Sequence, residues 1–276
     1  MNLYSRLARR ISGATPTIAL LTDFGTHDHY VAALRAVIHR INPTATVVDI
    51  SHHVEPQAVR QAGYLLWAVY RYFPHGTIFL CVVDPGVGTS RRILGVRTSH
   101  YSFVAPDNML LDFVLSEERG LESVEIPVSN NPFALPDDSS TFQGRDILAP
   151  VAAHRSNGVL FAKLGRPTIL HPVTSPFLDI DREESVKGEI VHIDRFGNMI
   201  TNLRCTDALV ATERIKAILM KGRRIQHWAN QYAGIRKGTP AMIVGSNKLV
   251  EIVVNSGSAA KKLNASVGDP LTLVRA

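Results

Sequence analysis

The stretch Thr77-Ile-Phe-Leu-Cys-Val-Val83, followed by Asp84-Pro-Gly-Val-Gly88, indicates how this 276-residue chain folds. An unbroken run of apolar, β-favouring residues is typical of a strand that is buried on both faces. The Pro-Gly-x-Gly behind it predicts a tight loop with exposed backbone amides. In an open α/β sheet, ligands bind in the crevice beyond the carboxyl ends of the strands. Asp84 is therefore a candidate functional carboxylate; the alternative is that it only caps the turn and pairs with Arg91.

Strands and helices alternate on both sides of this strand. Apolar runs predict further strands at 18–21, 46–50, 93–97 and 101–104, and helical periodicity follows residue 29, Pro56 and Arg145. Strands that alternate with helices imply a mostly parallel sheet covered on both faces. We therefore predict an α/β domain over residues 16–166, built on a mostly parallel sheet.

The pattern changes in the last part of the chain. Residues 167–187 contain three prolines and little periodicity, which predicts a linker. From residue 188 to 276, short strands separated by Gly and Asn turns are expected at 189–194, 199–203, 214–220, 241–245, 249–254 and 271–274. Such spacing predicts a smaller all-β domain, a barrel or a sandwich.

Charge argues against a nucleic-acid partner. The formal net charge is +6, but Arg6, Arg9 and Arg10 lie together within residues 1–15, which we interpret as a basic N-terminal extension. The other basic residues form no stripe with interleaved aromatic residues, and nucleic-acid surfaces normally show such clustering. No apolar run approaches the roughly 20 residues of a membrane span, so no membrane partner is expected either.

Cysteine and histidine usage suggests neither disulfides nor a metal site. Cys81 and Cys205 offer no disulfide framework and no metal-type spacing, so we expect a reducing compartment, the cytoplasm. The histidines at 27, 29, 52, 53 and 75 match no zinc ligand set. The sequence therefore predicts no bound metal.

Asp23 repeats the arrangement seen at Asp84. It follows the strand at 18–21 and precedes Gly25, so both acids are expected to face the same crevice. A carboxylate in this place can accept hydrogen bonds from a pair of ribose hydroxyls. The alternative is that Asp23 is the N-cap of the following helix. The chain has neither a G-x-G-x-x-G after its first strand nor a G-x-x-x-x-G-K, so standard nucleotide phosphate sites are not expected.

Three further segments carry candidate binding residues. The polar loop at 141–146 enters a helix and can point side chains, including Gln143, into the crevice. In Asp194-Arg-Phe-Gly-Asn198, the phenyl ring can stack on a flat heterocycle and the amide can hydrogen-bond its edge; the alternative is a plain turn with Phe196 in the core. Glu251 interrupts an apolar strand, which indicates either an exposed sheet edge or a cleft.

Together these segments resemble one family, over nearly the whole chain from Ile18 to Val274. They are similar to the adenosyl-forming S-adenosylmethionine (SAM) hydrolases, also called SAM hydroxide adenosyltransferases, which share a fold with SAM-dependent fluorinase and chlorinase. The resemblance rests on Leu21-Thr-Asp-Phe-Gly25, Asp49-Ile-Ser-His52, Asp84-Pro-Gly-Val-Gly88, Ala105-Pro-Asp-Asn108, Thr141-Phe-Gln-Gly-Arg-Asp146, Asp194-Arg-Phe-Gly-Asn198 with Thr201-Asn202, and Gly257-Ser-Ala259.

The resemblance implies a homotrimer with SAM bound between neighbouring subunits, and it assigns roles to individual residues. Asp23 would hold the ribose, and Phe196 and Asn198 the adenine. The methionine head group would meet Asp28, Asp194 and Ser246, while Glu251 and Val254 would line the pocket. The family's Asp-Arg-His set near the attacked carbon corresponds to Asp84, Arg91 and Gln143, so the third member differs here.

The implied activity is hydrolysis of SAM to adenosine and L-methionine by in-line attack of activated water or hydroxide at the ribose C5′. It needs no metal and no cofactor, since SAM is the substrate. The halogenases lack an Asp at the position of Asp84, which favours water over halide as the nucleophile. Two alternatives stay open: a catalytically impaired SAM- or adenosine-binding protein, because Gln143 cannot carry a proton at neutral pH, and a SAM-dependent halogenase.

Overall fold

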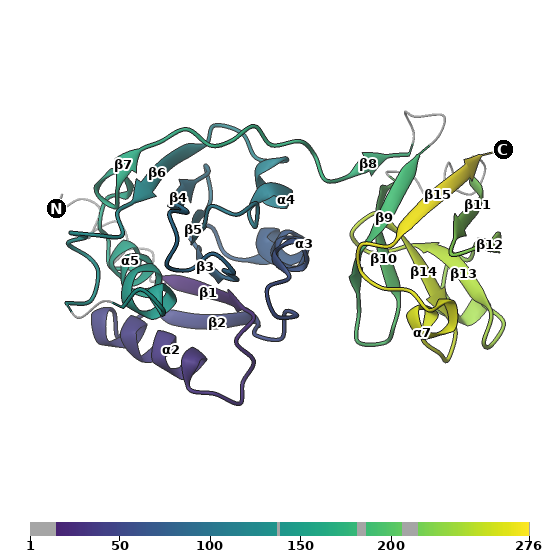
Figure 1. The fold of residues 1–276 in the computed structure, drawn as a ribbon, viewed down its shortest axis with the longest axis horizontal. Coiled ribbons are helices and arrows are strands. Elements are labelled where there is room, and N and C mark those ends of the chain that lie inside the picture. Colours follow the sequence, from purple (N-terminus) through teal and green to yellow (C-terminus); the bar gives the residue numbers. More distant parts are fainter. Residues whose placement is uncertain (1–14, 137–138, 181–185, 206–214, 276) are drawn as a thin grey trace. The chain divides into compact units, whose positions relative to one another are not determined.

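The computed structural model describes residues 15–136, 139–180, 186–205 and 215–275. It divides into two compact units, Met1–Thr174 and Ser175–Ala276, and each is described by itself (Figure 1). Except for Thr15, the predicted basic extension 1–15 lies outside the described residues. No described helix combines the length and the apolar character needed to cross a membrane.

The first unit is built on a seven-stranded sheet with the order β2-β1-β3-β5-β4-β6-β7. The strands are β1 (Thr17–Thr22), β2 (Thr46–Ser51), β3 (Ile78–Val82), β4 (Ile93–Arg97), β5 (Ser102–Pro106), β6 (Glu122–Ile126) and β7 (Arg166–Pro167). The strands β2, β1, β3 and β5 pair in parallel, whereas β4, β6 and β7 join the sheet antiparallel.

The prediction of a mostly parallel sheet is therefore correct only in part, because the parallel strands make up one side of the sheet. A tight turn joins β4 to β5, in which the Thr98 amide donates to the Tyr101 carbonyl at 3.0 Å. Such a short connection can only reverse the chain, whereas parallel strands need a long crossover. Strand β6 was not expected from the sequence, since it alternates polar and buried residues over a short span.

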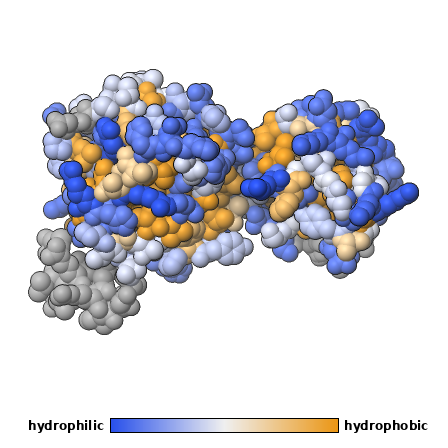
Figure 2. Space-filling view, turned by 90° about the horizontal axis from the view of Figure 1, so that it is seen from below, coloured by the Kyte–Doolittle hydropathy of each residue, from blue (hydrophilic) through white to orange (hydrophobic). Residues whose placement is uncertain are grey.

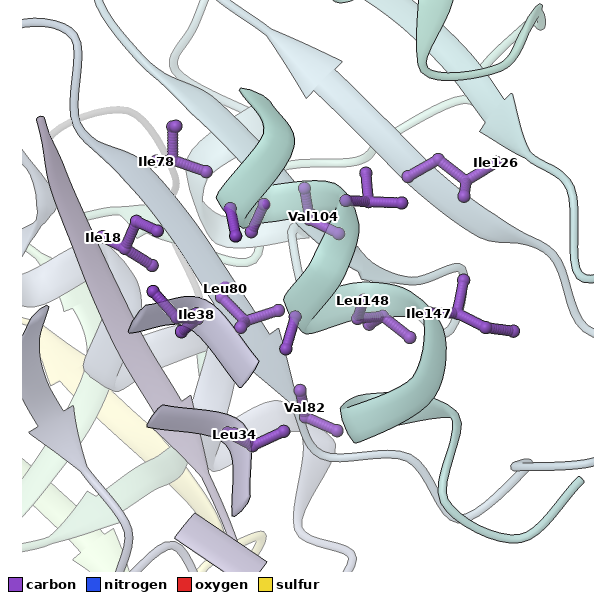
Figure 3. Close-up of a cluster of buried hydrophobic side chains, with 14 of the residues drawn as sticks. Ile18, Leu34, Ile38, Ile78, Leu80, Val82, Val104, Ile126, Ile147 and Leu148 are labelled. Carbon is purple, nitrogen blue, oxygen red and sulfur yellow. The ribbon is translucent and has the colours of Figure 1, made fainter. Parts of the chain in front are cut away.

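Helices cover both faces of this sheet (Figure 1). They are α2 (Tyr30–Ile41), α3 (Val59–Val69), α4 (Asp112–Leu115) and α5 (Ala149–Ser156), with short 3₁₀ turns η1 (Tyr70–Tyr72) and η3 (Phe161–Lys163). The predicted helix 145–154 begins with a π-helical turn, η2 (Gly144–Leu148), that leads into α5. Figure 3 shows the core on the α2 and α5 side, with apolar side chains of the strands facing those of the helices: Ile18, Ile78, Leu80, Val82 and Val104 against Leu34, Ile38 and Leu148.

The proline-containing segment predicted as a linker, 167–187, begins in β7 and ends at the start of β9; residues 181–185 lie outside the described part of the chain. The short strand β8 (Leu178–Asp179) lies within it. Its first half is attached to the first unit. The His171 Nε2 lies 2.9 Å from Asp112 Oδ1, and the Thr168 amide donates to the Ser123 carbonyl at 3.1 Å.

The second unit is an antiparallel all-β sheet, as the sequence predicted. Its strands follow the order β12-β11-β15-β9-β10-β14-β13, and β8 pairs in parallel with β10 off this path. They are β9 (Lys187–Ile193), β10 (Met199–Arg204), β11 (Ile215–Met220), β12 (Arg223–Ile225), β13 (Pro240–Val244), β14 (Leu249–Val254) and β15 (Pro270–Arg275). The end strands β12 and β13 approach each other, so the sheet nearly closes around a core of Ile, Leu, Val and Met.

Two short helical elements complete the second unit. The helix α7 (Ala259–Leu263) was not expected from the sequence; the Ser258 hydroxyl caps it by accepting from the Lys261 amide at 3.1 Å. The 3₁₀ turn η4 (Tyr232–Gly234) lies between β12 and β13. Apolar residues also reach the surface, as the orange areas of Figure 2 show. Exposed large apolar side chains include Tyr30 and Val87 in the first unit and Phe196 and Tyr232 in the second.

Candidate active site

The carboxyl ends of β1 and β3 form one wall of a cavity of about 660 Å³. These strands are direct neighbours, with Thr22 paired to Val82, so the residues that follow them emerge side by side. Asp23 and Asp84 both line the cavity, and Gln143 joins them from the start of the η2 turn. The expected crevice is therefore present, and it brings together three candidate residues from distant parts of the sequence.

Asp84, Arg91 and Gln143 form one hydrogen-bonded set. Arg91 donates to Asp84 Oδ2 from Nε at 2.8 Å and from Nη2 at 2.5 Å. The same Nη2 also donates to Gln143 Oε1. The side chains of Arg91 and Asp84 are only 9% and 7% exposed, so the ion pair is screened little by water. Asp84 thus does pair with Arg91, but it does so at a cavity wall and with a third polar residue attached.

The Pro-Gly-x-Gly loop holds this set by close backbone packing. Asp84 Oδ1 accepts from the Gly86 amide at 3.2 Å. Gly88 has a φ of +79°, and a Cβ there would lie 2.9 Å from the carbonyl oxygen of Ser140. Only glycine combines this backbone conformation with this approach. The loop that carries Asp84 therefore packs directly against the loop that leads to Gln143.

Asp146 anchors the segment that presents Gln143. Its side chain is fully buried and accepts hydrogen bonds from Arg145 Nε at 2.6 Å and from the Ser139 amide at 2.9 Å. Burial alone would raise the pKa of Asp146, but the hydrogen bonds from Arg145 and Ser139 outweigh it and hold the pKa below its usual value. The carboxylate is thus charged at neutral pH and ties the 139–142 loop to the helix start.

Asp23 is positioned by the loop that precedes α3. Its Oδ2 accepts from the backbone amide of Gln57 at 2.8 Å, and Gln57 has a φ of +65°. The alternative that Asp23 caps α2 is wrong, because the helix begins at Tyr30 and its N-cap, His29, has no side-chain cap. Asp28 lies exposed in the connection between Asp23 and α2 and is not among the residues that line the cavity.

A set of polar contacts that was not predicted from the sequence joins the buried Thr22 and His52 to the partly exposed Asp49 and Arg35. The Thr22 hydroxyl lies 2.8 Å from His52 Nδ1, and His52 Nε2 lies 3.1 Å from Asp49 Oδ1. Arg35 donates to Asp49, and this bond, with a smaller contribution from His52, lowers the pKa of Asp49. If Nε2 carries the imidazole proton, Nδ1 accepts from Thr22, whose oxygen accepts from the Phe24 amide at 3.3 Å.

Three aromatic rings also line the cavity and were missed. Phe24, Tyr30 and Phe142 lie with centroids 5.2 to 5.8 Å apart. Their edge-to-face and tilted contacts are favourable geometries for aromatic pairs. The position of Phe24 and Phe142 inside the two polar segments 22–25 and 141–146 is a signal that could have identified them. The cavity is therefore acidic at the strand ends and apolar beside them.

The second unit carries the other candidate residues in one tight turn. Asp194 Oδ1 accepts from the backbone amides of Phe196 at 2.9 Å and Asn198 at 2.8 Å, and its Oδ2 accepts from Asn198 Nδ2 at 2.9 Å. The Phe196 ring is 76% exposed, so the alternative that it packs in the core is wrong. A hollow of about 520 Å³ is lined by Asp194, Phe196 and Asn198 together with Tyr232 and Val254.

Glu251 lies in the interior of the second sheet. It pairs with Ile200 of β10 on one side and Ile243 of β13 on the other, so the edge-strand alternative is wrong. Burial raises its pKa to about 7, and the charge of Asp194 adds to this, while a hydrogen bond with Tyr232 acts in the opposite direction. A Cβ at position 245 would lie 1.8 Å from Glu251 Oε1, so the glycine is required to make room for the carboxylate.

The remaining candidates lie at the two ends of β14. Ser246 is exposed and follows Gly245 in the turn between β13 and β14. Val254 ends β14 and lines the hollow. Tyr232 was missed because it lies in an aperiodic stretch, and its partners Asn198, at 3.4 Å, and Glu251 are distant in sequence. Among the described residues, no group of three or more His, Cys, Asp or Glu side chains is placed to hold a metal ion.

Comparisons with known proteins identify the family of this chain. Models of the SAM hydroxide adenosyltransferase N-terminal and C-terminal domains match residues 18–165 and 188–272. The chain is 36% identical over 263 residues to a protein of Thermus thermophilus named (R)-S-adenosyl-L-methionine hydrolase, which covers 93% of this chain and 99% of the relative. A protein of the same name from Salinispora arenicola is 33% identical, with 94% and 97% covered.

More distant relatives and solved structures point to the same fold. A fluorinase of Nocardia brasiliensis is 29% identical, over 71% of this chain and 74% of its own. The crystal structure of an uncharacterized conserved protein from Thermotoga maritima superposes with a TM-score of 0.84 at 36% identity, covering 94% of this chain and 100% of that one. From the match of both domain models and the identity to these relatives, this chain belongs to the SAM hydroxide adenosyltransferase family.

Proposed function

We propose that this protein hydrolyses (R)-S-adenosyl-L-methionine to adenosine and L-methionine. The observation that carries the proposal is the buried Asp84–Arg91–Gln143 set on a cavity that Asp23 also lines. The two relatives described above, which match nearly end to end, are named for this activity. The family's fluorinases are less similar to this chain.

In the proposed reaction, a water oxygen attacks the ribose C5′ in line with the sulfonium. The O–C5′ bond forms, the C5′–S bond breaks, and the electron pair stays on sulfur, which leaves as a neutral thioether. Asp84 receives the proton of the water, and Arg91 fixes the orientation of the carboxylate. Opposite charges of a hydroxide-like nucleophile and a sulfonium cancel as the transition state forms, so a site with little water favours the reaction.

We also propose that Asp23 binds the ribose. Its Oδ2 already accepts the Gln57 amide, and that bond sets the orientation of the carboxylate. Each carboxylate oxygen has more than one acceptor position, so two vicinal hydroxyls can donate to the same group. Because Asp23 and Asp84 line one cavity, a nucleoside held by its ribose would present its C5′ side to Asp84.

The second unit, together with Asp28 of the first unit, would supply the remaining contacts. Phe196 and Asn198 are proposed to bind the adenine, and Asp28, Asp194 and Ser246 the methionine head group, while Glu251 and Val254 would line the pocket. We propose a homotrimer with SAM between neighbouring subunits, no cofactor, and a cytoplasmic location. Both cysteines are buried, and the described residues form no disulfide, which suits a reducing compartment.

The test is direct. The protein is incubated with SAM in H₂¹⁸O. Adenosine and methionine are then separated by chromatography, and the mass of each is measured by mass spectrometry. Attack at C5′ places ¹⁸O in the adenosine 5′-hydroxyl. An unlabelled adenosine would refute the proposed step, and release of no adenosine at micromolar enzyme would refute the activity.

Gln143 favours a second candidate function, a SAM- or adenosine-binding protein with little turnover. A glutamine cannot act as a proton carrier at neutral pH. This candidate predicts tight calorimetric binding of SAM without product. Halogenation is a third candidate, and it predicts 5′-chloro- or 5′-fluoro-adenosine when the corresponding halide is added.

A further inference from the structure

The contact between Arg91 and Gln143 fixes which end of the glutamine amide faces the cavity. An arginine side chain carries only N–H donors and no acceptor. The atom of Gln143 that faces Arg91 Nη2 must therefore be the carbonyl oxygen, Oε1. The amide nitrogen, Nε2, consequently points away from Arg91.

The surroundings of Nε2 show where it points. Gln143 is only 3% exposed, and it lines the same cavity as Asp84. Nε2 donates no hydrogen bond to any other described residue. It is also not one of the polar side-chain atoms that are fully enclosed by protein and lack a hydrogen-bond partner, so part of its surface is accessible. Nε2 therefore retains contact with the cavity. The cavity wall thus presents an N–H donor from Gln143 beside the carboxylate of Asp84.

We propose that Gln143 is a catalytic hydrogen-bond donor to the attacking water, and that Asp84 alone accepts the proton. This inference rests on the proposed hydrolysis of SAM. A water molecule has two protons and two lone pairs. One proton is directed at Asp84, one lone pair accepts from Gln143 Nε2, and the second lone pair is left for C5′. As the O–C5′ bond forms and the C5′–S bond breaks, the directed proton passes to Asp84 and the sulfur keeps the electron pair.

A donor role accounts for a glutamine at a position where the resemblance implies a histidine. A neutral imidazole that accepts from Arg91 with one ring nitrogen would carry its proton on the other. It would then present an N–H to the cavity, as the glutamine amide does. In this geometry the two residues perform the same donor role, and Gln143 is a functional substitute for histidine.

Gln143→Glu gives the decisive test. Glutamate has nearly the same shape and can still accept from Arg91, but its carboxylate has no N–H to donate and is a potential base. If Gln143 is a donor, kcat for adenosine release falls by about 10²-fold, by analogy with the loss of one donor from an oxyanion hole. If a base were needed at this position, kcat would rise. A rate equal to or above that of the wild type overturns the proposal.

A matched control and a second variant complete the set. Gln226→Glu makes the same change at an exposed position of the second unit and is expected to leave kcat and KM unchanged.

The second variant is Gln143→His. Its rate is expected to fall as the pH drops below about 6.5, because a protonated imidazole can no longer accept from Arg91. A kcat more than about 100-fold above the wild type at pH 8 would instead show that a base is missing, and would overturn the proposal. Thermal melting and SAM calorimetry report whether each variant folds and binds.

Failure of the proposed function can be told apart from failure of this inference. If the wild type releases no adenosine, the hydrolase proposal falls, whereas the orientation of Gln143 is still open to measurement. A neutron crystal structure of the wild type locates the deuterons. Two deuterons on the Gln143 atom that faces the cavity support the donor assignment, and deuterons on the atom that faces Arg91 overturn it.

Discussion

The two units hold their candidate residues in different ways. In the first, the polar contacts join residues far apart in sequence: Arg91 bridges Asp84 to Gln143, and all three side chains are more than nine-tenths buried. In the second, the contacts of Asp194 stay within its own five-residue turn, and the Phe196 ring stands exposed. Buried, pre-oriented charges suit bond-making chemistry, whereas an exposed ring on a rigid turn suits recognition.

This contrast gives a general expectation for variants. Changes in the Asp84 set should act mainly on kcat, because they alter groups beside the reacting atoms. Changes in the 194–198 turn should act mainly on KM, because they alter contacts that form equally in the ground state and the transition state.

The largest effect is expected for Asp84→Asn. Asparagine keeps the shape but can neither take up the proton nor balance the charge of Arg91, so kcat should fall by about 10²- to 10⁴-fold. KM should change much less. The measurement is steady-state adenosine release, with Asp179→Asn in β8 as the matched control. A kcat within a factor of two of the wild type would show that Asp84 is not the proton acceptor.

The next largest effect concerns the pH dependence of stability, which we expect to come from Glu251 of the second unit. Glu251 has a pKa of about 7 in the folded protein against an ordinary value of 4.5, so the fold binds this proton more tightly than the unfolded chain does. The stabilisation is complete below about pH 4.5 and is lost as the pH rises through 7. A shift of this size corresponds to at most about 3 kcal/mol, and less where solvent reaches the group.

Glu251→Gln should remove this pH dependence. The free energy of unfolding, measured by urea denaturation at pH 5 and pH 8, should fall more with pH for the wild type than for the variant. Glu125→Gln changes an exposed glutamate of the first unit and should leave the wild-type dependence intact. Equal pH dependence in wild type and Glu251→Gln would show that this carboxyl titrates normally.

How much of the fold and of the candidate site could be predicted from the sequence depended on how far apart in the sequence the contacting residues lie. The central parallel strands were predicted because β3 is an unbroken apolar run, and Asp23 and Asp84 were placed together because parallel strands end at one edge. The strand at 93–97 was predicted but not its antiparallel direction, and β6 was missed because it is short and half polar. The exposed Phe196 and the internal Glu251 each had two interpretations, which only burial and strand order could separate.

The contacts that were missed are ones that no local pattern encodes. Thr22 meets His52 through a pairing of β1 and β2 whose register shifts after Leu20. The segment 49–52 was recognised as part of a family resemblance, but nothing in its spacing indicates a partner. Tyr232 likewise contacts Asn198 only after the second sheet nearly closes.

A smaller effect is expected for Thr22→Val. Valine has nearly the same shape, but without the hydroxyl the His52 Nδ1 loses its hydrogen-bond partner and the Phe24 amide loses its acceptor. Leaving such buried groups unpaired costs about 1–3 kcal/mol of unfolding free energy. KM for SAM should rise severalfold because Asp23 is the next residue. Thr22→Ser retains the hydroxyl and should restore both quantities, and a destabilised Ser variant would point to packing instead.

The smallest effect, and the sharpest test of the contrast, is expected for Phe196→Ala. An exposed ring contributes little to folding, so the unfolding free energy should change by no more than about 0.5 kcal/mol. If the ring stacks on adenine, its loss costs about 0.5–1.5 kcal/mol of binding, which corresponds to a rise in KM of roughly threefold to tenfold. Phe196→Trp keeps a flat aromatic face and should stay close to the wild-type KM. A fall in kcat without a change in KM would contradict the division of roles, because it would place the second unit's turn in the chemical step and leave binding to the cavity at Asp23 and Asp84.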